Sequence, residues 1–288
     1  MPELPEIETI KIGLRKYLIG HKITNIEIKI PKMFIGDKSK VINAKITNLK
    51  RIGKGLIIEL SNNYLLVIHL KMTGQLIYCS DKTKNIKLSK KTGGNMLPSK
   101  YSHIIISLDK NATLFYNDLR RFGWIKVIKK EELMKIPFFK EMGPEPKVGN
   151  DIFGKELTFE YFKKVVQKGK LSIKVLLMDQ KRIGGIGNIY ANDALFKAGI
   201  DPRRKGKDLK ESEVKNIYNA IFYVISKSME YGGSSDENFV NALGQEGSYQ
   251  NHALVYGKKG QKCPKGNGII EKIKLGGRGT YFCPKCQR

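Results

Sequence analysis

The hydrophobic pattern of the chain changes from strand to helix period near residue 143, and this change constrains the fold more than any other feature. From Ile23 to about Val127 apolar residues tend to alternate with polar ones, which is typical of antiparallel strands. After Gly143-Pro144-Glu145-Pro146 and Gly149 the apolar residues recur at helical spacing. The sequence therefore predicts a β domain, a linker and then a helical domain.

The individual elements are placed by apolar stripes and turn residues. A leading helix is expected to begin near Pro5 and to end at Gly20, with Ile7, Ile10, Leu14 and Leu18 as its buried stripe. Strands are expected at 55–60, 64–70, 103–108 and 113–116, and helices at 158–167, 171–178, 188–197 and 212–231. The polar, lysine-rich stretch 81–100 is expected to be a flexible loop.

The charge of the chain favours a polyanionic partner. Lys and Arg number 53 and Asp and Glu 27, so the net charge is +26 over 288 residues. Such a surplus suits nucleic acid, because Lys and Arg displace counterions from phosphates, although a merely solvated surface is the alternative. A hydrophobic fraction of 41% excludes intrinsic disorder. We expect no membrane span and no secretion leader, and therefore a cytoplasmic protein.

The cysteines indicate a metal site more than a disulfide scaffold. Cys263, Cys283 and Cys286 crowd the C-terminus, whereas Cys79 lies far away and is expected to be buried and inert. Four cysteines are too few for disulfide bonds to stabilise a chain of this length. The cluster therefore indicates a set of metal ligands in a reducing compartment.

The N-terminus carries residues suited to covalent catalysis. Removal of Met1 would expose Pro2 as a secondary amine, which is partly neutral and nucleophilic at cellular pH. Its attack on an aldehyde-like carbon would give an iminium ion, which is an electron sink. Glu3 could move protons beside this amine and Glu6 could orient the pair. A helix start rich in Pro and Glu, without chemistry, is the alternative.

Several motifs, in a constant order along the whole chain, carry a resemblance to a known family. They are Pro2–Thr9, Arg51–Gly55, His69–Gly74, Asp118–Gly123, Gly143–Pro146, Gly185–Ala191, Val255–Gly257 and Gly277–Thr280. In these motifs the chain resembles the bacterial formamidopyrimidine-DNA glycosylases, which are repair enzymes for 8-oxoguanine and ring-opened purines.

The resemblance implies a bifunctional DNA glycosylase and abasic-site lyase of base excision repair, acting on oxidised purines in duplex DNA. Pro2 would be the Schiff-base nucleophile and Glu3 the proton donor and acceptor that helps to open the sugar ring. Lys54 would be a general acid in β-elimination and Arg278 in the following δ-elimination. Taken alone, Lys54 is equally a solvated turn lysine and Arg278 one more phosphate contact.

The resemblance also implies an α+β fold in four parts. Residues 1–142 would form a catalytic antiparallel β-sandwich with a leading helix, and 143–150 a linker. Residues 151–250 would form a helix-two-turn-helix DNA-binding domain, and 251–288 a zinc-finger-like β-hairpin. Within the third part, 232–249 resembles the lesion-recognition loop, whose glycines suit a mobile loop that closes over an everted base.

DNA contacts follow from the same resemblance. Met72, Arg120 and Phe122 would fill the space left by the extruded nucleotide, although Met72 and Phe122 in isolation are ordinary core residues. Phosphate contacts are expected from the following set: His69, Tyr101, Lys170, Lys174, Asn188 and Arg278. Lys170 and Lys174 are expected to share one face of a helix, with solvated lysines as the alternative. The expected partner is double-stranded DNA with oxidised bases, bound by a monomer.

The C-terminus departs from the family pattern. The family closes with a four-cysteine zinc hairpin, in which Cys263, Cys283 and Cys286 match but Gly266 occupies the second ligand position. Structural zinc sites are usually closed by four ligands. We expect Zn²⁺ on three cysteines with water or an outside ligand, and a metal-free hairpin is the alternative.

Two other functions stay open. The first is an oxidised-pyrimidine glycosylase of the endonuclease VIII type, which typically has Gly where this chain has Leu4. The second is a basic DNA-binding protein without catalysis, for which Gly266 is the supporting feature.

Overall fold

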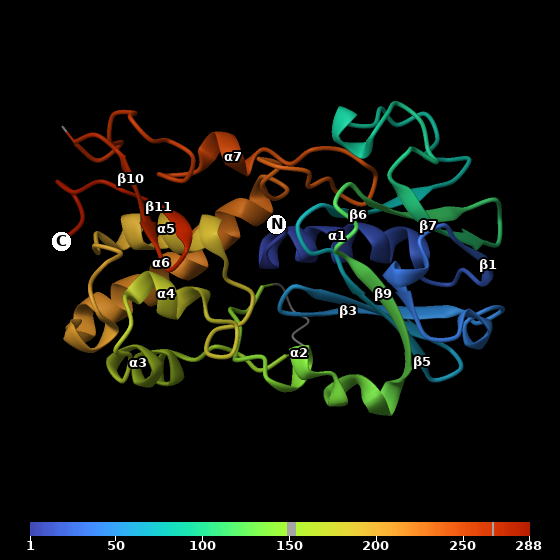
Figure 1. The fold of residues 1–288 in the computed structure, drawn as a ribbon, viewed down its shortest axis with the longest axis horizontal. Helices are drawn as coiled ribbons and strands as arrows, with labels where there is room; N and C mark the ends of the chain where they lie inside the picture. The colour runs from blue at the N-terminus through green and yellow to red at the C-terminus, as the bar shows by residue number, and fades with distance from the viewer. Residues whose placement is uncertain (149–153, 267) are drawn as a thin grey trace. The chain divides into compact units, whose positions relative to one another are not determined.

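The computed structural model describes residues 1–148, 154–266 and 268–288, which divide into two compact units (Figure 1). The first unit comprises Met1–Lys140 and Tyr231–Ser248, and the second comprises Glu141–Glu230 and Tyr249–Arg288. The expected linker 143–150 and domain start at 151 fall partly on residues 149–153, which lie outside the described residues.

The segment Tyr231–Ser248 differs from the domain plan drawn from the sequence, which placed it with the helical domain. Its Phe239 and Ala242 belong to the hydrophobic core of the β unit. A Cβ added to Gly13 on the first helix would lie 2.7 Å from the Ala242 Cβ, so the helix and the segment pack closely. Burial of these apolar side chains explains why the segment joins the first unit.

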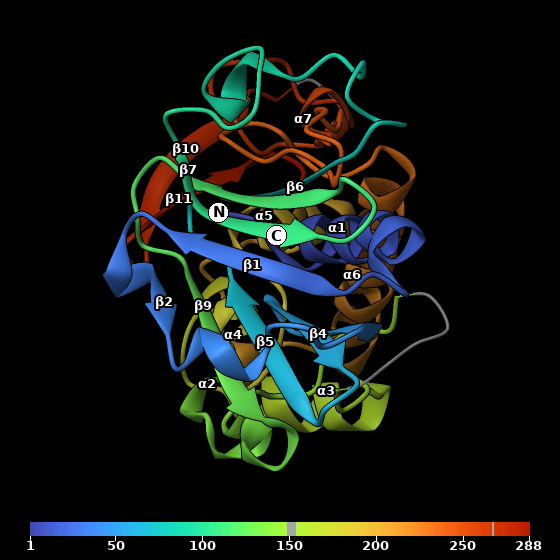
Figure 2. The same cartoon turned by 90° about the vertical axis from the view of Figure 1, so that its right-hand side faces the viewer.

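The first unit is a sandwich of two sheets with a leading helix, α1 (Leu4–Leu18). Its strands are β1 (Ile23–Ile28), β2 (Phe34–Ile35), β3 (Ile46–Ile52), β4 (Gly55–Leu60), β5 (Tyr64–His69), β6 (Gly74–Cys79), β7 (Ser102–Leu108), β8 (Thr113–Asp118) and β9 (Trp124–Lys129). One sheet has the order β1-β7-β8-β6 and the other β2-β9-β5-β4-β3 (Figure 2). The ladders are antiparallel except for the short β2–β9 pair, so the predicted sandwich is confirmed.

Short helical turns connect or follow these strands. They are η1 (Pro31–Met33), η2 (Lys38–Lys40), η3 (Lys90–Thr92), η4 (Lys130–Lys135) and α2 (Pro137–Lys140). The turns at Asn62-Asn63 and at 109–111 take the left-handed backbone that such turns need, with φ of 62° at Asn63 and 55° at both Lys110 and Asn111.

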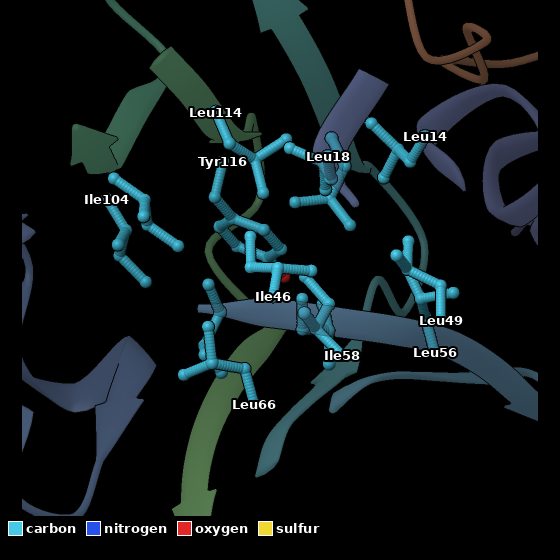
Figure 3. Close-up of a cluster of buried hydrophobic side chains, with 14 of the residues drawn as sticks. Leu14, Leu18, Ile46, Leu49, Leu56, Ile58, Leu66, Ile104, Leu114 and Tyr116 are labelled. Atoms are coloured by element: carbon cyan, nitrogen blue, oxygen red, sulfur yellow. The ribbon is translucent and has the colours of Figure 1, made fainter. Parts of the chain in front are cut away.

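The core of the first unit lies between the two sheets and against α1 (Figure 3). Leu14 and Leu18 come from the predicted stripe of the helix, and both are fully buried. Ile58 and Leu66 face them from one sheet, and Tyr116 comes from the other. Interlocked apolar burial on three sides fixes the register of the strands that carry the site.

The second unit consists of helices and one C-terminal hairpin. Its elements are α3 (Phe159–Gln167), α4 (Ile173–Met178), α5 (Asn188–Ala198), η5 (Gly206–Asp208), α6 (Glu211–Glu230), α7 (Tyr249–His252), β10 (Glu271–Leu275) and β11 (Arg278–Phe282). The Thr158 side chain caps α3 by accepting a hydrogen bond from the Tyr161 amide. Among the described residues, no helix is both long and apolar enough to cross a membrane.

Polar side chains on α5 hold the hairpin and the segment that leads to it. The fully buried Asp193 carboxylate accepts hydrogen bonds from the Tyr249 hydroxyl and from the amides of Leu254, Val255 and Tyr256. Burial raises the pKa of Asp193, although these four donors oppose the shift. Asn192 accepts a hydrogen bond of 2.8 Å from the Tyr281 amide of β11, so α5 positions the hairpin directly.

Candidate active site

The start of α1 places the N-terminal residues in a buried setting. Pro2 is buried and Glu3 is only 3% exposed. The Glu6 carboxylate accepts the Glu3 amide at 2.8 Å on one oxygen and the Ser234 amide at 2.8 Å on the other. Glu6 therefore joins the helix start to the Tyr231–Ser248 loop, and its role in orienting Pro2 and Glu3 stays a prediction.

Close approach of the loop to Glu6 depends on glycine. Gly233 has φ of 86°, and a Cβ there would lie 2.9 Å from the Phe239 ring and 3.2 Å from Glu6 Oε1. The same loop reaches the chain terminus, since the Met1 ammonium lies 2.9 Å from Glu237 Oε2. The loop that resembles a lesion-recognition loop thus contacts the N-terminal residues directly.

Lys54 lies on the two-residue turn between β3 and β4. Ile52 pairs with Gly55 across this turn, and Gly53 has φ of 55°, which suits the first central position of a tight hairpin turn. Lys54 is 5% exposed, so the alternative of a solvated turn lysine does not fit its environment.

A buried ion network fixes the turn that carries Lys54 against α1. The Glu8 carboxylate contacts Lys11 Nζ at 2.7 Å and Arg51 Nε at 2.8 Å, and all three side chains are 2–3% exposed. Arg51 also donates a hydrogen bond of 2.9 Å to the Gly53 carbonyl oxygen. No role was predicted for Glu8 or Arg51 from the sequence, although both lie in the motifs that carry the resemblance.

His69 lies at the end of β5 as a neutral imidazole. Its Nδ1 accepts a hydrogen bond from the Lys71 amide at 2.9 Å, so its proton is assigned to Nε2. Burial, together with the charges of Lys71 and Lys54, lowers the pKa of His69 to about 3. The centre of its ring lies 4.9 Å from the centre of the Phe138 ring, in an edge-on contact, and 5.9 Å from the centre of the Trp124 ring. His69 can therefore offer a neutral N–H donor but no positive charge near neutral pH.

This low pKa predicts a pH-dependent stability. The unfolded chain binds a proton on His69 below about pH 6.5 and the folded chain only below about pH 3, so stability falls as pH falls through this window. Between pH 7 and pH 5, His69 should reduce the free energy of unfolding by about 2 kcal/mol. Urea unfolding of the native protein and His69→Gln at both pH values measures the difference. Equal pH dependence in the two proteins would contradict the assignment.

Met72, Arg120 and Phe122, which the sequence analysis grouped, do lie together. Arg120 Nη1 lies 3.0 Å from Met72 Sδ, and its guanidinium stands 4.8 Å from the centre of the Phe122 ring. Phe122 is 54% exposed, so the alternative of an ordinary core residue is wrong for it. The three side chains form one partly exposed cluster of a thioether, a guanidinium and an aromatic ring.

Asp118 organises both loops that carry this cluster. It is fully buried, and its carboxylate accepts hydrogen bonds from the Thr73 hydroxyl, the Arg120 amide at 3.1 Å and the Gly123 amide at 2.7 Å. One carboxylate therefore fixes the turn before Arg120 and ties it to the loop after Met72. This role of Asp118 was not predicted, although an acidic residue directly before Leu119-Arg120-Arg121-Phe122-Gly123 is a usable sequence signal.

The variant Asp118→Asn tests whether Asp118 positions the cluster of Met72, Arg120 and Phe122, as distinct from stabilising the fold in general. An amide replaces one acceptor oxygen by a donor, and charge-assisted hydrogen bonds contribute about 1.5–3 kcal/mol each. We expect excision from a lesion-containing duplex to slow about ten- to hundredfold. Cleavage of single-stranded abasic DNA, which leaves no stacked gap to fill, should change only a few-fold. Asp81→Asn, on the exposed loop, is the matched control, and equal losses on both substrates would contradict the role.

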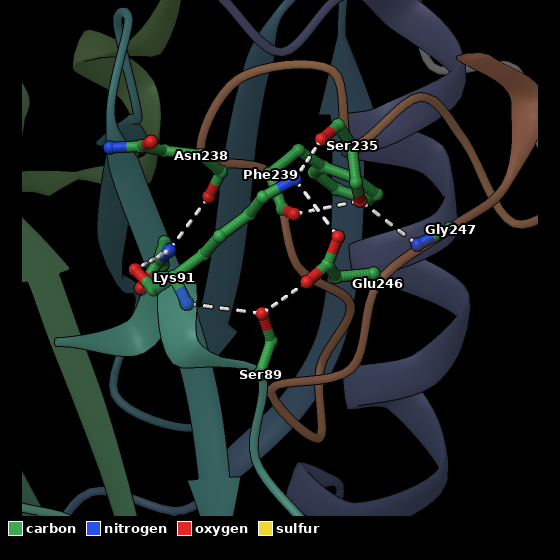
Figure 4. A network of polar contacts seen from close by, with 8 residues as sticks. Ser89, Lys91, Ser235, Asn238, Phe239, Glu246 and Gly247 are labelled. Atoms are coloured by element: carbon green, nitrogen blue, oxygen red, sulfur yellow. Dashed lines mark hydrogen bonds and ion pairs between the residues drawn. The ribbon is translucent and has the colours of Figure 1, made fainter. Parts of the chain in front are cut away.

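The stretch 81–100 is tied to the Tyr231–Ser248 loop by polar contacts (Figure 4). Glu246 accepts a hydrogen bond from the Ser89 hydroxyl and pairs with Lys91 Nζ at 2.9 Å. Lys91 also donates to the Ser235 carbonyl oxygen, and the Gly244 carbonyl accepts the Ser89 amide at 2.8 Å. The sequence described 81–100 only as a flexible loop, because the residues that bind it lie more than 140 positions away.

Tyr101 follows this stretch and directly precedes β7. It is half-buried, its ring packs close to Gly93, and its carbonyl oxygen accepts the Asp118 amide at 3.0 Å. Tyr101 therefore lies beside the loop that carries Arg120 and Phe122.

In the second unit, Lys170 and Lys174 do not share a helix face, so that prediction is wrong. Lys170 is exposed in the loop before α4, which begins only at Ile173. Lys174 is fully buried, and its ammonium donates to the Gly279 carbonyl oxygen at 2.9 Å and to Thr280 Oγ1 at 2.7 Å. Lys174 thus holds the C-terminal hairpin, and its ammonium is directed to these two acceptors instead of to a phosphate at the surface.

Arg278 and Asn188 lie at exposed or half-buried ends of elements. Arg278 is exposed at the first position of β11, after the turn Gly276-Gly277 with φ of 56° and 75°. A Cβ on Gly276 would lie 2.6 Å from Val175 Cγ2, so α4 contacts this turn closely. Asn188 is half-buried and is the first residue of α5, directly after the N-cap residue Gly187.

The three C-terminal cysteines form one cluster. Their sulfur atoms all lie within 4.8 Å of one another, and Cys263 Sγ lies 3.5 Å from Cys286 Sγ. A tetrahedral zinc–thiolate centre with bonds of about 2.3 Å places its sulfurs about 3.8 Å apart. The cluster therefore fits three corners of a zinc site. Cys79 lies apart in the first unit, half-buried at the end of β6, and burial raises its pKa.

Three family models match successive parts of the chain. They are described as the formamidopyrimidine-DNA glycosylase N-terminal domain over residues 1–125, the formamidopyrimidine-DNA glycosylase H2TH domain over 142–239, and a zinc finger found in FPG and IleRS over 260–288. The chain belongs to the formamidopyrimidine-DNA glycosylase family. The H2TH model overlaps most of the region 151–250 expected to be a helix-two-turn-helix domain, and the finger model covers the cysteine cluster.

Relatives and solved structures agree along the full length. The chain is 36% identical over 293 residues to a formamidopyrimidine-DNA glycosylase from Pelotomaculum thermopropionicum and 38% identical over 291 residues to one from Rickettsia africae; each match covers 100% of this chain and 99% of the relative. Two structures from Lactococcus lactis, a mutant protein with Fapy-dG-containing DNA and a complex with abasic-site DNA, match with a TM-score of 0.86 and 32% identity. The first match covers 100% of both chains and the second 99%.

As a family member the chain is a DNA glycosylase of base excision repair, and the family's activity includes abasic-site lyase chemistry. The zinc finger of the family is present, and its three clustered cysteines are consistent with bound zinc.

Proposed function

We propose that the chain excises oxidised purines from duplex DNA and then cleaves the resulting abasic site through a Schiff base on Pro2. The observation that carries the proposal is the buried start of α1, where Glu6 holds the Glu3 amide and the Ser234 amide of the loop at once. This arrangement supports the proposal, because Glu6 brings the residue after Pro2 and the Tyr231–Ser248 loop to one carboxylate. The Lactococcus lactis relatives bound to Fapy-dG and to abasic DNA support the substrate class.

The chemistry begins once Met1 has been removed. The Pro2 nitrogen bonds to C1′ of the damaged nucleotide, and the base leaves with its bonding electrons and a proton. Glu3 protonates the ring oxygen as the sugar opens, which gives an iminium ion between Pro2 and C1′. The iminium acidifies the C2′ proton, so loss of that proton expels the 3′ phosphate. A second elimination then expels the 5′ phosphate.

Lys54 serves the β-elimination as a general acid, and Arg278 serves the δ-elimination that follows. Lys54 is buried on a fixed turn, so its ammonium needs little reorganisation to protonate a leaving group. Arg278 stands exposed at the tip of the C-terminal hairpin, where it can meet a phosphate but stays protonated at all physiological pH values. We therefore assign Arg278 the stabilisation and orientation of the δ-elimination, with proton transfer through water.

Base extrusion is supported by the cluster on the β unit. Met72 and Phe122 supply apolar bulk for the emptied position in the stack, and Arg120 supplies donors for the unpaired partner base. His69, Tyr101, Lys170, Asn188 and Arg278 would contact phosphates, with Asn188 at a helix start that favours anions. For Lys174 we propose support of the hairpin that carries Arg278, since its ammonium is buried there.

Zinc would be held by Cys263, Cys283 and Cys286. Bound zinc would connect the segment before β10, which carries Cys263, to the residues after β11, which include Cys283 and Cys286. It would contribute to the stability of the folded hairpin and would take no part in the reaction. We further propose that the protein acts as a monomer on the chromosome in the bacterial cytoplasm.

Borohydride trapping on two duplexes tests the substrate assignment. One duplex carries 8-oxoguanine opposite cytosine and the other carries thymine glycol, with protein whose Met1 removal has been verified. We expect faster trapping on the first duplex. Strong trapping on thymine glycol alone would instead assign the endonuclease VIII type of activity, and salt-dependent binding without any adduct would assign a non-catalytic DNA-binding protein.

A further inference from the structure

Two turns of the second unit repeat one short sequence with a single difference. The first reads Cys263-Pro264-Lys265-Gly266 and the second Cys283-Pro284-Lys285-Cys286. Both close with the same backbone hydrogen bond, from the fourth residue to the first: 3.3 Å from the Gly266 amide to the Cys263 carbonyl and 3.1 Å from the Cys286 amide to the Cys283 carbonyl. The two turns therefore present their fourth residues in equivalent positions.

A side chain at position 266 would point toward the sulfur cluster. A Cβ added there would lie 3.7 Å from Cys286 Sγ and would meet no other atom within 4 Å. Its φ lies outside the left-handed region, so the backbone accepts any side chain without strain. Gly266 is also exposed, in contrast to the buried Cys263 and Cys283. The corner of the ligand set that Gly266 leaves vacant thus faces solvent.

Within the described part of the chain, no fourth protein ligand fills this corner. Among the His, Cys, Asp and Glu side chains of the described residues, only the three cysteines share the cluster. Three thiolates on Zn²⁺ give a net charge of −1, and zinc strongly prefers a fourth ligand. The exposed Lys262, Lys265 and Lys285 lie in or beside the two turns, so a further anionic ligand meets a positive environment.

We propose that the zinc finger of this chain keeps one exchangeable coordination position at Gly266, which binds water in the free protein and is taken by a small thiolate from solution. Soft sulfur ligands are favoured because zinc already holds three of them and the lysines offset the added charge. The open coordination position allows this zinc site to bind a ligand from solution. A zinc finger with four cysteine ligands has no such position.

Co²⁺ replaces zinc as a coloured probe of this position. The full-length, reduced, metal-free protein is titrated with Co²⁺ and its ligand-field bands are recorded before and after addition of β-mercaptoethanol. We expect the thiol to shift and intensify the bands of the native protein, because a sulfur replaces a water oxygen. Gly266→Cys should show the sulfur-rich spectrum from the start and should not respond to the thiol.

Gly266→Ala is the matched control, because it adds the same Cβ without a ligand atom. It should respond to the thiol as the native protein does. Competition with a chromophoric chelator should show at least about tenfold tighter Zn²⁺ binding by Gly266→Cys than by either of the others.

Three outcomes would overturn the proposal. They are a native spectrum that ignores the thiol, equal zinc affinity of the native protein and Gly266→Cys, and a native protein that binds neither metal. These readouts do not involve DNA, so their failure is distinguishable from failure of the proposed glycosylase function.

Discussion

Replacement of Pro2 by leucine is expected to reduce borohydride trapping on lesion-containing duplex by more than about a thousandfold. Initiator methionine is retained before a large second residue, so the α-amine would belong to Met1 and position 2 would hold an amide nitrogen without a nucleophilic lone pair. Position 2 is buried, and leucine keeps it apolar. We therefore expect the affinity for DNA to change only a few-fold. Trapping kinetics and a binding titration at one salt concentration measure the two quantities.

Pro2→Ala is the matched control for this variant. Methionine is removed before alanine, so a primary amine stands at position 2 and can still form an imine. We expect trapping to persist at a lower rate, because an imine needs protonation to withdraw electrons whereas an iminium on proline is always cationic. Undiminished trapping by Pro2→Leu would mean that another amine, with Lys54 as the first candidate, is the nucleophile.

Glu8→Ala is expected to lower the free energy of unfolding by about 3–5 kcal/mol, the largest stability effect that we predict for a polar residue. The Glu8 carboxylate is the shared partner of Lys11 and Arg51, and all three side chains are buried. Its removal takes this carboxylate away from two buried cations, and loosens the turn that carries Lys54. Chemical denaturation followed by circular dichroism gives the stability change.

A surface glutamate provides the comparison for Glu8. Glu27 lies 3.8 Å from Lys29 and is 56% exposed, so Glu27→Ala should change stability by less than about 0.5 kcal/mol. Glu8→Gln, which keeps the side-chain volume, serves if Glu8→Ala does not fold. Equal, small losses in the Glu8 and Glu27 variants would contradict the proposed network.

The architecture was predicted well from the sequence because the spacing of apolar residues indicates which side of each helix or strand is buried. The switch from strand to helix period separated the strands of the first unit from the helices of the second, and β4 (Gly55–Leu60) agrees with its predicted range. The helix predicted at 171–178 begins at Ile173, because Leu171 and Ser172 belong to the loop that pairs with Lys205. Such end effects depend on long-range pairing, which a local pattern does not contain.

Long-range polar contacts explain the rest of what the sequence missed. Lys174 reads as a surface lysine, but its ammonium meets two acceptors more than 100 residues away in β11. Asp118 and Glu8 likewise gain their roles only from partners brought together by the fold. The placement of Tyr231–Ser248 in the first unit depends on the burial of Phe239, which no helical or strand period reveals.

The most direct test of the account is mass spectrometry of the borohydride-trapped complex after digestion. The account predicts that Met1 is absent and that the reduced sugar is attached to the nitrogen of Pro2. An adduct on Lys54, or fully active protein that still carries Met1, would contradict it.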